Sequence, residues 1–202
     1  TYLTLDSCNV QHNIGNGASN DHSTRVSGGS HVTFKNCHFV RGCRTGIWVM
    51  KSHFFTMENC YLTAMSNHPP IQIMPNTNDP DTVTIKRPIV RNCIFINSNY
   101  SDGIYSRYCE QFAFYNNLFI RSSTPMSIDC HTGFHYPVGQ PEDTCNAKGG
   151  IIAYNTIIEN GSQSIYFNIG TNQINFLNNI YYNTNAGEFF GRFDSPNNAI
   201  YR

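Results

Sequence analysis

Two residues of opposite charge, Arg107 and Asp129, occupy matching positions in consecutive segments of the chain. If these segments are adjacent strands, the two side chains lie side by side and can act as a pair in proton transfer or in stabilising developing charge. Lys51 and His131 fall near them in a turn and an insertion, so we treat all four as catalytic candidates. The alternative is a surface ion pair between Arg107 and Asp129, which would stabilise the fold by only about 0–1 kcal/mol.

Large aromatic residues recur at one position of the same series of segments. Trp48, Tyr105 and Tyr166 share this position with the polar residue Gln72. Flat rings beside polar groups suit the apolar faces and hydroxyl edges of sugar rings. The alternative is that these side chains only cover the sheet beneath them. Three aromatic residues in one row favour sugar binding, so these four residues are substrate-binding candidates, together with His135 in the nearby insertion.

The candidate residues can meet only if the chain is built from repeats. Seven segments align, and a large apolar residue follows the fifth position of each by three residues; the segments are 3–10, 32–39, 55–62, 88–95, 112–119, 151–158 and 174–181. Six of them carry Asn at the fifth position, and these are Asn36, Asn59, Asn92, Asn116, Asn155 and Asn178. The asparagines are 23, 33, 24, 39 and 23 residues apart. A unit near 23 with two expanded copies favours a coil of three short strands that buries its inner face by stacking on its neighbours.

The recurrence of Asn at the fifth position of six segments predicts a tight bend between two strands, because Asn tolerates the left-handed backbone. With coils about 4.8 Å apart, the amides can also hydrogen-bond along the stack. A further strand recurs at 24–26, 46–49, 70–73, 103–106, 125–128 and 164–167. Alternation along it sends two rows of side chains outward. The first row is Arg25, Trp48, Gln72, Tyr105, Ser127 and Tyr166, and the second is Ser27, Met50, Met74, Arg107, Asp129 and Asn168.

The bend motif, as in NCIF at 92–95, NNLF at 116–119 and NNIY at 178–181, resembles the right-handed parallel β-helix repeat of the pectate-lyase-like superfamily. The resemblance covers nearly the whole chain. It implies an all-β, single-domain right-handed parallel β-helix of about eight coils. Two insertions, 75–87 and 130–150, leave the same turn two coils apart, so we expect them to wall a groove on one side. The fold alone does not settle the activity.

The resemblance also implies a chemistry. Lyases of this architecture use a Lys or Arg base, often with Ca²⁺ held by acidic residues, to abstract a proton next to a uronate carboxylate. By this resemblance Arg107 is the base or charge stabiliser, and Asp129 orients it. The chain departs from the enzymes because Asp79 and Asp81 are too few for a Ca²⁺ site. It also lacks the paired carboxylates of the pectin hydrolases, since Asp102 and Asp129 are the only acidic candidates on this face.

Two functions therefore stay open. The first is an extracellular protein that engages polysaccharide, and we expect it to be a polysaccharide lyase-like, carbohydrate-active protein. The second is a noncatalytic β-helix, such as an adhesin, a tailspike module or a segment of a structural fibre. We expect no metal or other cofactor, and Ca²⁺ is implied by the family resemblance alone.

The cysteines divide into two groups. Four of them directly follow the bend position, and these are Cys8, Cys37, Cys60 and Cys93. We expect them to form an inward file of small buried side chains, because stacked parallel side chains seldom meet disulfide torsions and do not converge on a metal. Cys130 and Cys145 bracket an insertion, and a disulfide between them would stabilise the fold by about 3 kcal/mol and imply an oxidising compartment. Cys43 and Cys109 are placed in turns without assigned partners.

The composition limits the partners. Lys and Arg number 13, as do Asp and Glu, so the formal net charge is zero. Nucleic acid and anionic membranes both need a cationic surface, so we expect a polysaccharide or glycan partner and a secreted, extracellular or surface-exposed location, virion surfaces included. No apolar run reaches the roughly 18 residues of a membrane span. Open solenoid ends need covering, so we expect a single domain over 1–202 within a longer chain, or end-to-end or homo-oligomeric packing.

Overall fold

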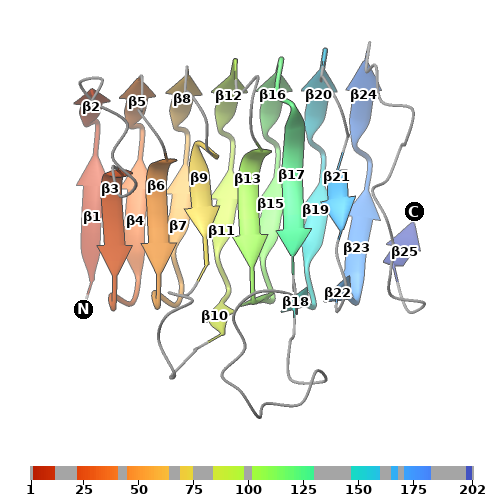
Figure 1. Ribbon diagram of the computed structural model, residues 1–202, viewed down its shortest axis with the longest axis horizontal. Helices are drawn as coiled ribbons and strands as arrows, with labels where there is room; N and C mark the ends of the chain where they lie inside the picture. Colours follow the sequence, from red (N-terminus) through yellow and green to blue (C-terminus); the bar gives the residue numbers. More distant parts are fainter. Residues whose placement is uncertain are drawn as a thin grey trace.

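The chain folds into a stack of parallel strands. The computed structural model describes residues 2–11, 22–40, 45–63, 69–74, 84–97, 102–129, 147–159, 165–167, 171–182 and 199–201. Every strand pair in these ranges is parallel, and the strands form four sheets that run along one axis (Figure 1). The all-β parallel β-helix predicted from the repeat is therefore confirmed. The described part of the chain holds no helix that is long and apolar enough to span a membrane.

Sheet A forms the back of the solenoid in Figure 1, and sheet B lies along its upper side. The eight strands of sheet A are β1 (Leu3–Asp6), β4 (Val32–Lys35), β7 (Thr56–Glu58), β11 (Ile89–Arg91), β15 (Ala113–Tyr115), β19 (Ile151–Ala153), β23 (Ile174–Leu177) and β25 (Ala199–Tyr201). The seven strands of sheet B are β2 (Asn9–Gln11), β5 (His38–Val40), β8 (Tyr61–Thr63), β12 (Ile94–Ile96), β16 (Leu118–Ile120), β20 (Thr156–Ile158) and β24 (Ile180–Tyr182). Each strand of sheet B follows a strand of sheet A across one bend, which is the strand pair that the repeat predicts.

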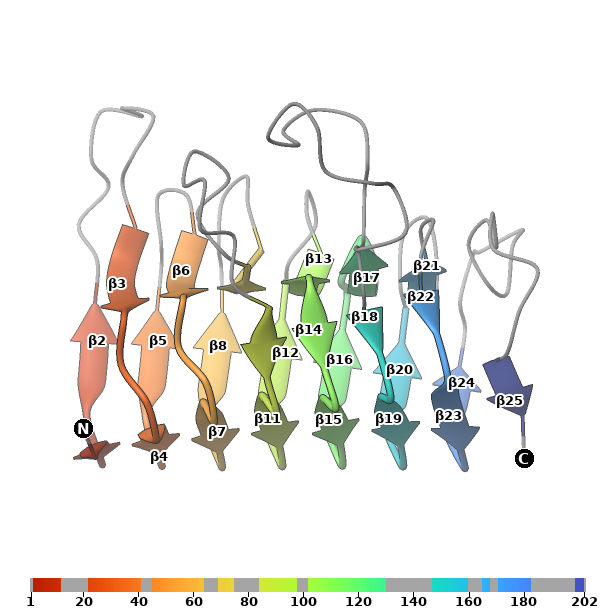
Figure 2. The ribbon, with the colours of Figure 1, turned by 90° about the horizontal axis from the view of Figure 1, so that it is seen from below.

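Sheet C forms the front of the solenoid in Figure 1. Its six strands are β3 (His22–Ser27), β6 (Thr45–Met50), β9 (Ile71–Ile73), β13 (Asp102–Arg107), β17 (Thr124–Asp129) and β21 (Ile165–Phe167). A fourth sheet, D, was not predicted and has the strands β10 (Ile85–Lys86), β14 (Cys109–Glu110), β18 (Ala147–Lys148) and β22 (Thr171–Asn172). In chain order, its strands follow sheet C and precede sheet A (Figure 2).

The strands of sheet D differ from two predictions, one about Cys109 and one about the two insertions. Cys109 was placed in a turn, but it lies in strand β14 and is buried. The insertions 75–87 and 130–150 were treated as loops throughout, but each ends in a short strand, β10 or β18. Both strands pair with β14, so the two insertions return to the same side of the solenoid two strands apart, as predicted.

The bends between sheets A and B have the left-handed backbone that the Asn repeat predicts. The φ angle is 54° at Asn36, Asn59 and Asn92, 55° at Asn116 and 52° at Asn178. The amides also form part of the expected ladder: Asn36 Nδ2 donates to Asp6 Oδ1 at 2.9 Å, and Asn59 Nδ2 donates to Asn36 Oδ1 at 3.3 Å.

The bend of the sixth coil differs from the prediction. The left-handed residue there is Tyr154, with φ 56°, and not Asn155. Strand β19 aligns Ile151 with Ala113, so Asn155 matches Asn117, one position after the bend, and is fully buried. The same shift makes Ile157, rather than Ile158, the buried residue of strand β20. The prediction that Asn155 occupies a bend was therefore wrong by one residue.

The position after the bend carries a file of small polar or sulfur-containing side chains along the stack. Its members are Cys8, Cys37, Cys60, Cys93, Asn117, Asn155 and Asn179. The predicted inward file of cysteines is confirmed: all four are free thiols, and only Cys8 is not fully buried. Thiols donate to backbone carbonyls two residues earlier, as in Cys93 Sγ to Arg91 O at 3.1 Å. The asparagines continue the file with amide hydrogen bonds, such as Asn155 Nδ2 to Asn179 Oδ1 at 2.9 Å.

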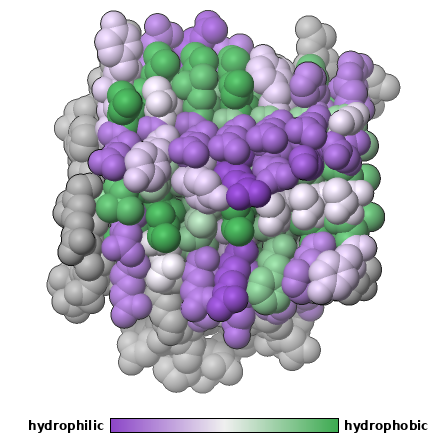
Figure 3. Space-filling view, turned by 180° about the vertical axis from the view of Figure 1, so that it is seen from behind, coloured by the Kyte–Doolittle hydropathy of each residue, from purple (hydrophilic) through white to green (hydrophobic). Residues whose placement is uncertain are grey.

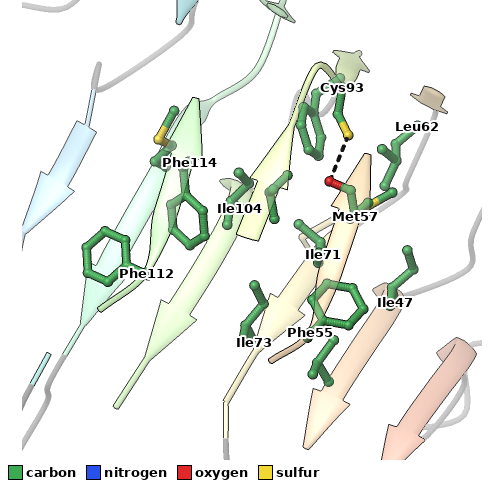
Figure 4. Packing of buried hydrophobic residues seen from close by; sticks show 14 of the residues in the cluster. Ile47, Phe55, Met57, Leu62, Ile71, Ile73, Cys93, Ile104, Phe112 and Phe114 are labelled. Carbon is green, nitrogen blue, oxygen red and sulfur yellow. Dashed lines mark hydrogen bonds between the residues drawn. The ribbon is translucent and has the colours of Figure 1, made fainter. Parts of the chain in front are cut away.

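The core consists of parallel files of apolar side chains, one from each inward position (Figure 4). Neighbouring coils stack like residues, for example Phe95 on Phe119 with ring centroids 4.7 Å apart. In sheet C, the predicted inward residues Ile47, Ile71 and Ile104 are fully buried. Because these files fill the interior, every second residue of sheet C must face outward, and those residues form the candidate site.

Candidate functional site

The first outward row of sheet C is confirmed by the strand register. Each member lies opposite the next in a neighbouring strand, in the order Arg25, Trp48, Gln72, Tyr105, Ser127 and Tyr166. All four residues predicted to bind substrate from this sheet therefore lie in one line across four strand spacings. His135, the fifth, lies outside the described residues.

The residues of this row differ in how far they are buried. Trp48, Tyr105 and Tyr166 are partly exposed, although the indole Nε1 atom of Trp48 is buried. Ser127, between the two tyrosines, is only 4% exposed. Gln72, between Trp48 and Tyr105, is held at both ends of its amide: its Oε1 accepts from Thr45 Oγ1 at 3.3 Å, and its Nε2 donates to Met74 Sδ at 2.6 Å. The two polar residues that lie between the rings, Gln72 and Ser127, are therefore fixed or small.

Two guanidinium groups lie against rings of this row. The Arg25 guanidinium carbon is 5.5 Å from the centroid of the Trp48 ring, and that of Arg107 is 5.4 Å from the centroid of the Tyr105 ring. Contacts of this kind stabilise a cation over an aromatic ring by about 0.5–1 kcal/mol at exposed sites. They also hold each cation beside a ring, where a ligand on that ring can meet it.

The second outward row is confirmed in part. Arg107 lies opposite Asp129 in the pairing of β13 with β17, so the two catalytic candidates are neighbours, although the Asp129 side chain is outside the described part of the structure. Met50 and Met74 were expected to face solvent in this row, but they are only 2% and 6% exposed. Within the described residues, the row is accessible at Ser27, which is exposed, and at Arg107, which is partly exposed.

Lys51 directly follows strand β6 in a left-handed turn with φ 49°. Strand β9 lies between β6 and β13, so the backbone of Lys51 is two strand spacings, about 10 Å, from that of Arg107. The structure thus places Lys51 at the same end of sheet C as Arg107 without bringing the two together. His131, Cys130 and Cys145 lie outside the described residues, as does the groove expected between the insertions.

Sequence reasoning missed a row of charged residues on the outer face of sheet A. Lys35, Glu58, Arg91 and Tyr115 lie opposite one another in successive strands. Arg91 donates to both Glu58 and Tyr115, and Lys35 Nζ lies 3.6 Å from Glu58 Oε1. The Arg91 hydrogen bond holds the pKa of the Glu58 carboxyl below its usual range. The common offset of these residues, one position before the bend, would have revealed the row.

The row on sheet A satisfies its own charges, so we assign it a structural role. A polar belt crosses the back of the molecule between more apolar surfaces (Figure 3). Among the residues that the structure describes, no group of three or more His, Cys, Asp or Glu side chains could hold a metal ion. The arrangement most suited to an external ligand is therefore the alternating row on sheet C.

Comparisons with known proteins agree with the fold. The family described as a right handed beta helix region matches residues 25–200. A solved structure of the catalytic domain of a GH87 alpha-1,3-glucanase in complex with tetrasaccharides is similar, with a TM-score of 0.56, 10% identity and 97% of this chain covered. The chain spans 49% of that structure. An alginate lyase from Paenibacillus sp. str. FPU-7 aligns with 88% of this chain and 76% of its own at 11% identity and a TM-score of 0.42. The sequence matches no curated protein.

Proposed function

Because the chain belongs to the right-handed β-helix family, we propose that it engages polysaccharide and that the outer face of sheet C binds the glycan. The observation that carries this proposal is the single row in which Trp48, Tyr105 and Tyr166 alternate with polar residues. A sugar has apolar ring faces and polar edges, and an aromatic ring beside an amide or a guanidinium matches both. The tetrasaccharide complex of a glucanase with this fold adds support.

We further propose a catalytic role in which the protein is a polysaccharide lyase. In such a reaction a base removes the proton next to a uronate carboxylate. The electron pair forms a carbon–carbon double bond, and the glycosidic oxygen leaves with a proton. The planar guanidinium of Arg107 can bind the carboxylate and stabilise the charge that develops on it, or act as the base. Asp129, on the adjacent strand, would orient Arg107.

The alternative function is a noncatalytic glycan-binding module. The length of the row supports this alternative. The row extends from Tyr105 through Trp48 to Arg25, which lies three strand spacings away from the strand that carries Arg107. Such a length serves binding whether or not a bond is cleaved. Either function is consistent with a secreted, extracellular or surface-exposed location, where polysaccharides are met, and we propose that location.

Glycan binding is tested by arrays of oligosaccharides and by titration of the strongest ligand. Trp48→Ala and Tyr105→Ala should weaken binding while the circular dichroism spectrum stays that of the wild type, because both side chains face outward. Tyr61→Ala is the matched control, since Tyr61 is a partly exposed aromatic residue on sheet B. Binding that does not change in either sheet C variant would remove sheet C as the site.

Catalysis is tested by incubation with a panel of uronate polysaccharides and by ultraviolet absorbance of unsaturated products. Arg107→Lys keeps the charge but loses the planar fork, so it should remove most of the activity, as should Asp129→Asn. An active protein that keeps full turnover after both changes would redirect the search to Lys51, His131 and His135. Glycan binding without unsaturated product from any substrate would support the noncatalytic alternative.

A further inference from the structure

The outward row of sheet C has a period of two strands. Read from β3 to β21, it alternates polar and aromatic residues: Arg25, Trp48, Gln72, Tyr105, Ser127, Tyr166. Neighbouring strands are about 4.8 Å apart, so successive rings are about 9.6 Å apart and the three rings span about 19 Å. A ligand that uses all three must therefore be long, and it must present the same apolar surface at this interval.

We propose that the row selects an extended, diequatorially linked polysaccharide, such as a β-1,4-linked chain, which lies along the axis of the solenoid. This inference rests on the proposed function and names the substrate class of that site. In such a chain successive sugars are turned by about half a turn, so every second sugar presents the same face. One two-sugar unit also has nearly the length of two strand spacings, about 9.6 Å. Rings on every second strand therefore stack on every second sugar.

The residues between the rings suit the intervening sugars. Ser127 is almost fully buried between Tyr105 and Tyr166, and Gln72 is held by Thr45 and Met74. Neither side chain stands in the way of a sugar that spans two rings. The exposed guanidinium of Arg25 continues the alternation beyond Trp48 and offers hydrogen-bond donors to a sugar there. Each two-sugar unit thus meets one ring, and the buried or held residue between two rings leaves room for the other sugar.

The same geometry disfavours coiled polysaccharides. Diaxially linked chains and chains with 1,3 linkages advance by a different length for each sugar, so their sugars drift out of register with rings that are about 9.6 Å apart. A sugar of such a chain can stack on one ring of the row, but no later sugar is then placed to stack on the next ring. The strands fix the spacing of the rings, so the site does not match a polysaccharide whose repeating unit has another length.

The test is a length series measured by calorimetry with the 202-residue chain. The ligands are β-1,4-linked gluco-oligosaccharides and oligomannuronates of two to seven sugars, which are neutral and acidic diequatorial chains. Oligogalacturonates and α-1,3-gluco-oligosaccharides are the controls with other geometries. A trisaccharide reaches two rings and a pentasaccharide reaches three. We expect the affinity to rise by about twofold to tenfold from three to five sugars, with little gain at four or seven, and a sixth sugar adds only its contact with Arg25.

Variants at the end of the row sharpen the test. Tyr166→Ala should lower the affinity for the pentasaccharide to that for the trisaccharide. It should lower the affinity for the trisaccharide by only about twofold, because one of two equivalent placements is lost. Tyr61→Ala on sheet B is again the control and should leave the whole series unchanged. The series with the unaltered chain is informative by itself if a variant fails to fold.

The outcomes separate the inference from the proposed function. The inference is supported if the affinity for diequatorial chains, in either the neutral or the acidic series, increases sharply at three sugars and again at five. Binding that rises evenly with each added sugar overturns it and leaves glycan binding on sheet C intact. A preference for oligogalacturonates or for 1,3-linked chains has the same effect. If none of these glycans binds, both the inference and the proposed function fail.

Discussion

Replacing Asn117 by Ala tests whether the file of side chains after the bends holds neighbouring coils together. Asn117 is only 2% exposed, and its amide contacts the coils on both sides. Its Oδ1 accepts from the Cys93 N–H at 3.0 Å. Its Nδ2 donates to the Val90 carbonyl at 3.0 Å and to Asn155 Oδ1 at 3.1 Å. Alanine removes all three hydrogen bonds but leaves the bend and the strands in place.

The size of the effect follows from what is left behind. The buried Cys93 N–H loses the acceptor that Asn117 provides, and an unsatisfied buried group costs about 1–3 kcal/mol. The two other hydrogen bonds contribute about 0.5–1.5 kcal/mol each. Asn155 Oδ1 keeps a donor, because it also accepts from the Asn117 backbone N–H at 3.0 Å. We therefore expect a loss of about 2–6 kcal/mol in the free energy of unfolding.

The chain itself supplies the matched control, because the same position holds Cys in earlier coils. Cys60 Sγ accepts from the Cys37 N–H at 3.4 Å and donates to the Glu58 carbonyl at 3.2 Å. Asn117→Cys should therefore keep a weaker acceptor for the Cys93 N–H and lose less stability than Asn117→Ala, by about 1 kcal/mol.

Urea-induced unfolding followed by circular dichroism measures both changes. The midpoint should fall most for Asn117→Ala and less for Asn117→Cys, with a similar slope for the two variants. An alanine variant within about 0.5 kcal/mol of the wild type would refute the reasoning, since that is the range of ordinary surface substitutions. A cysteine variant as unstable as the alanine variant would show that the acceptor for Cys93 is not what stabilises the file.

Three further predictions concern other positions of the repeat. Asn116→Val puts a β-branched residue at φ 55°, so we expect a loss of about 1–3 kcal/mol, and an unchanged melting temperature would contradict the bend register. Gly150→Ala would place a methyl group against the buried ring of Phe112 and should cost about 1–3 kcal/mol; an equally stable variant would mean that the ring moves freely. Arg91 lowers the pKa of Glu58 in the folded state, so this contribution is present above the unfolded pKa of about 4.3 and is lost as the pH falls through the lower folded value. Glu58→Gln should therefore flatten the acid side of the stability–pH curve, and an unchanged acid side would contradict the assignment.

The outward rows of sheet C could be predicted from the sequence because they depend only on alternation. Once Ile47, Ile71 and Ile104 are placed inward, Trp48 and Tyr105 must point outward, and the structure confirms both directions. Alternation gives the direction of a side chain but not what covers it. For that reason the burial of Met50 and Met74 could not be predicted, and neither could the two-residue strands of sheet D, which are too short to show a period.

The error at Asn155 has a different cause. In the structure, Gly150 takes the inward position that Phe112 holds in the preceding coil, so the first apolar residue of this repeat is missing. Without it, Ile151 was aligned with Phe112, which moved Asn155 into the bend. The inward position of Asn155 is compatible with burial only because its amide donates to the Phe114 carbonyl and to Asn179 Oδ1. A single sequence does not reveal those partners. Residue 155 has the same type as the bend residues of other coils, and this likeness led to the wrong register.

The three large sheets use the same stacking but present different outer surfaces, and this difference argues for sheet C as the binding face. On sheet A, Lys35, Glu58 and Arg91 neutralise one another from strand to strand. The middle of sheet B presents Ile94 and Leu118 in adjacent strands, which offer no polar partner to a sugar. Among the residues that the structure describes, rings and polar groups alternate from strand to strand only in sheet C. Since the stack fixes the strand spacing, a linear polymer with a matching repeat can be recognised there without any rearrangement of the coils.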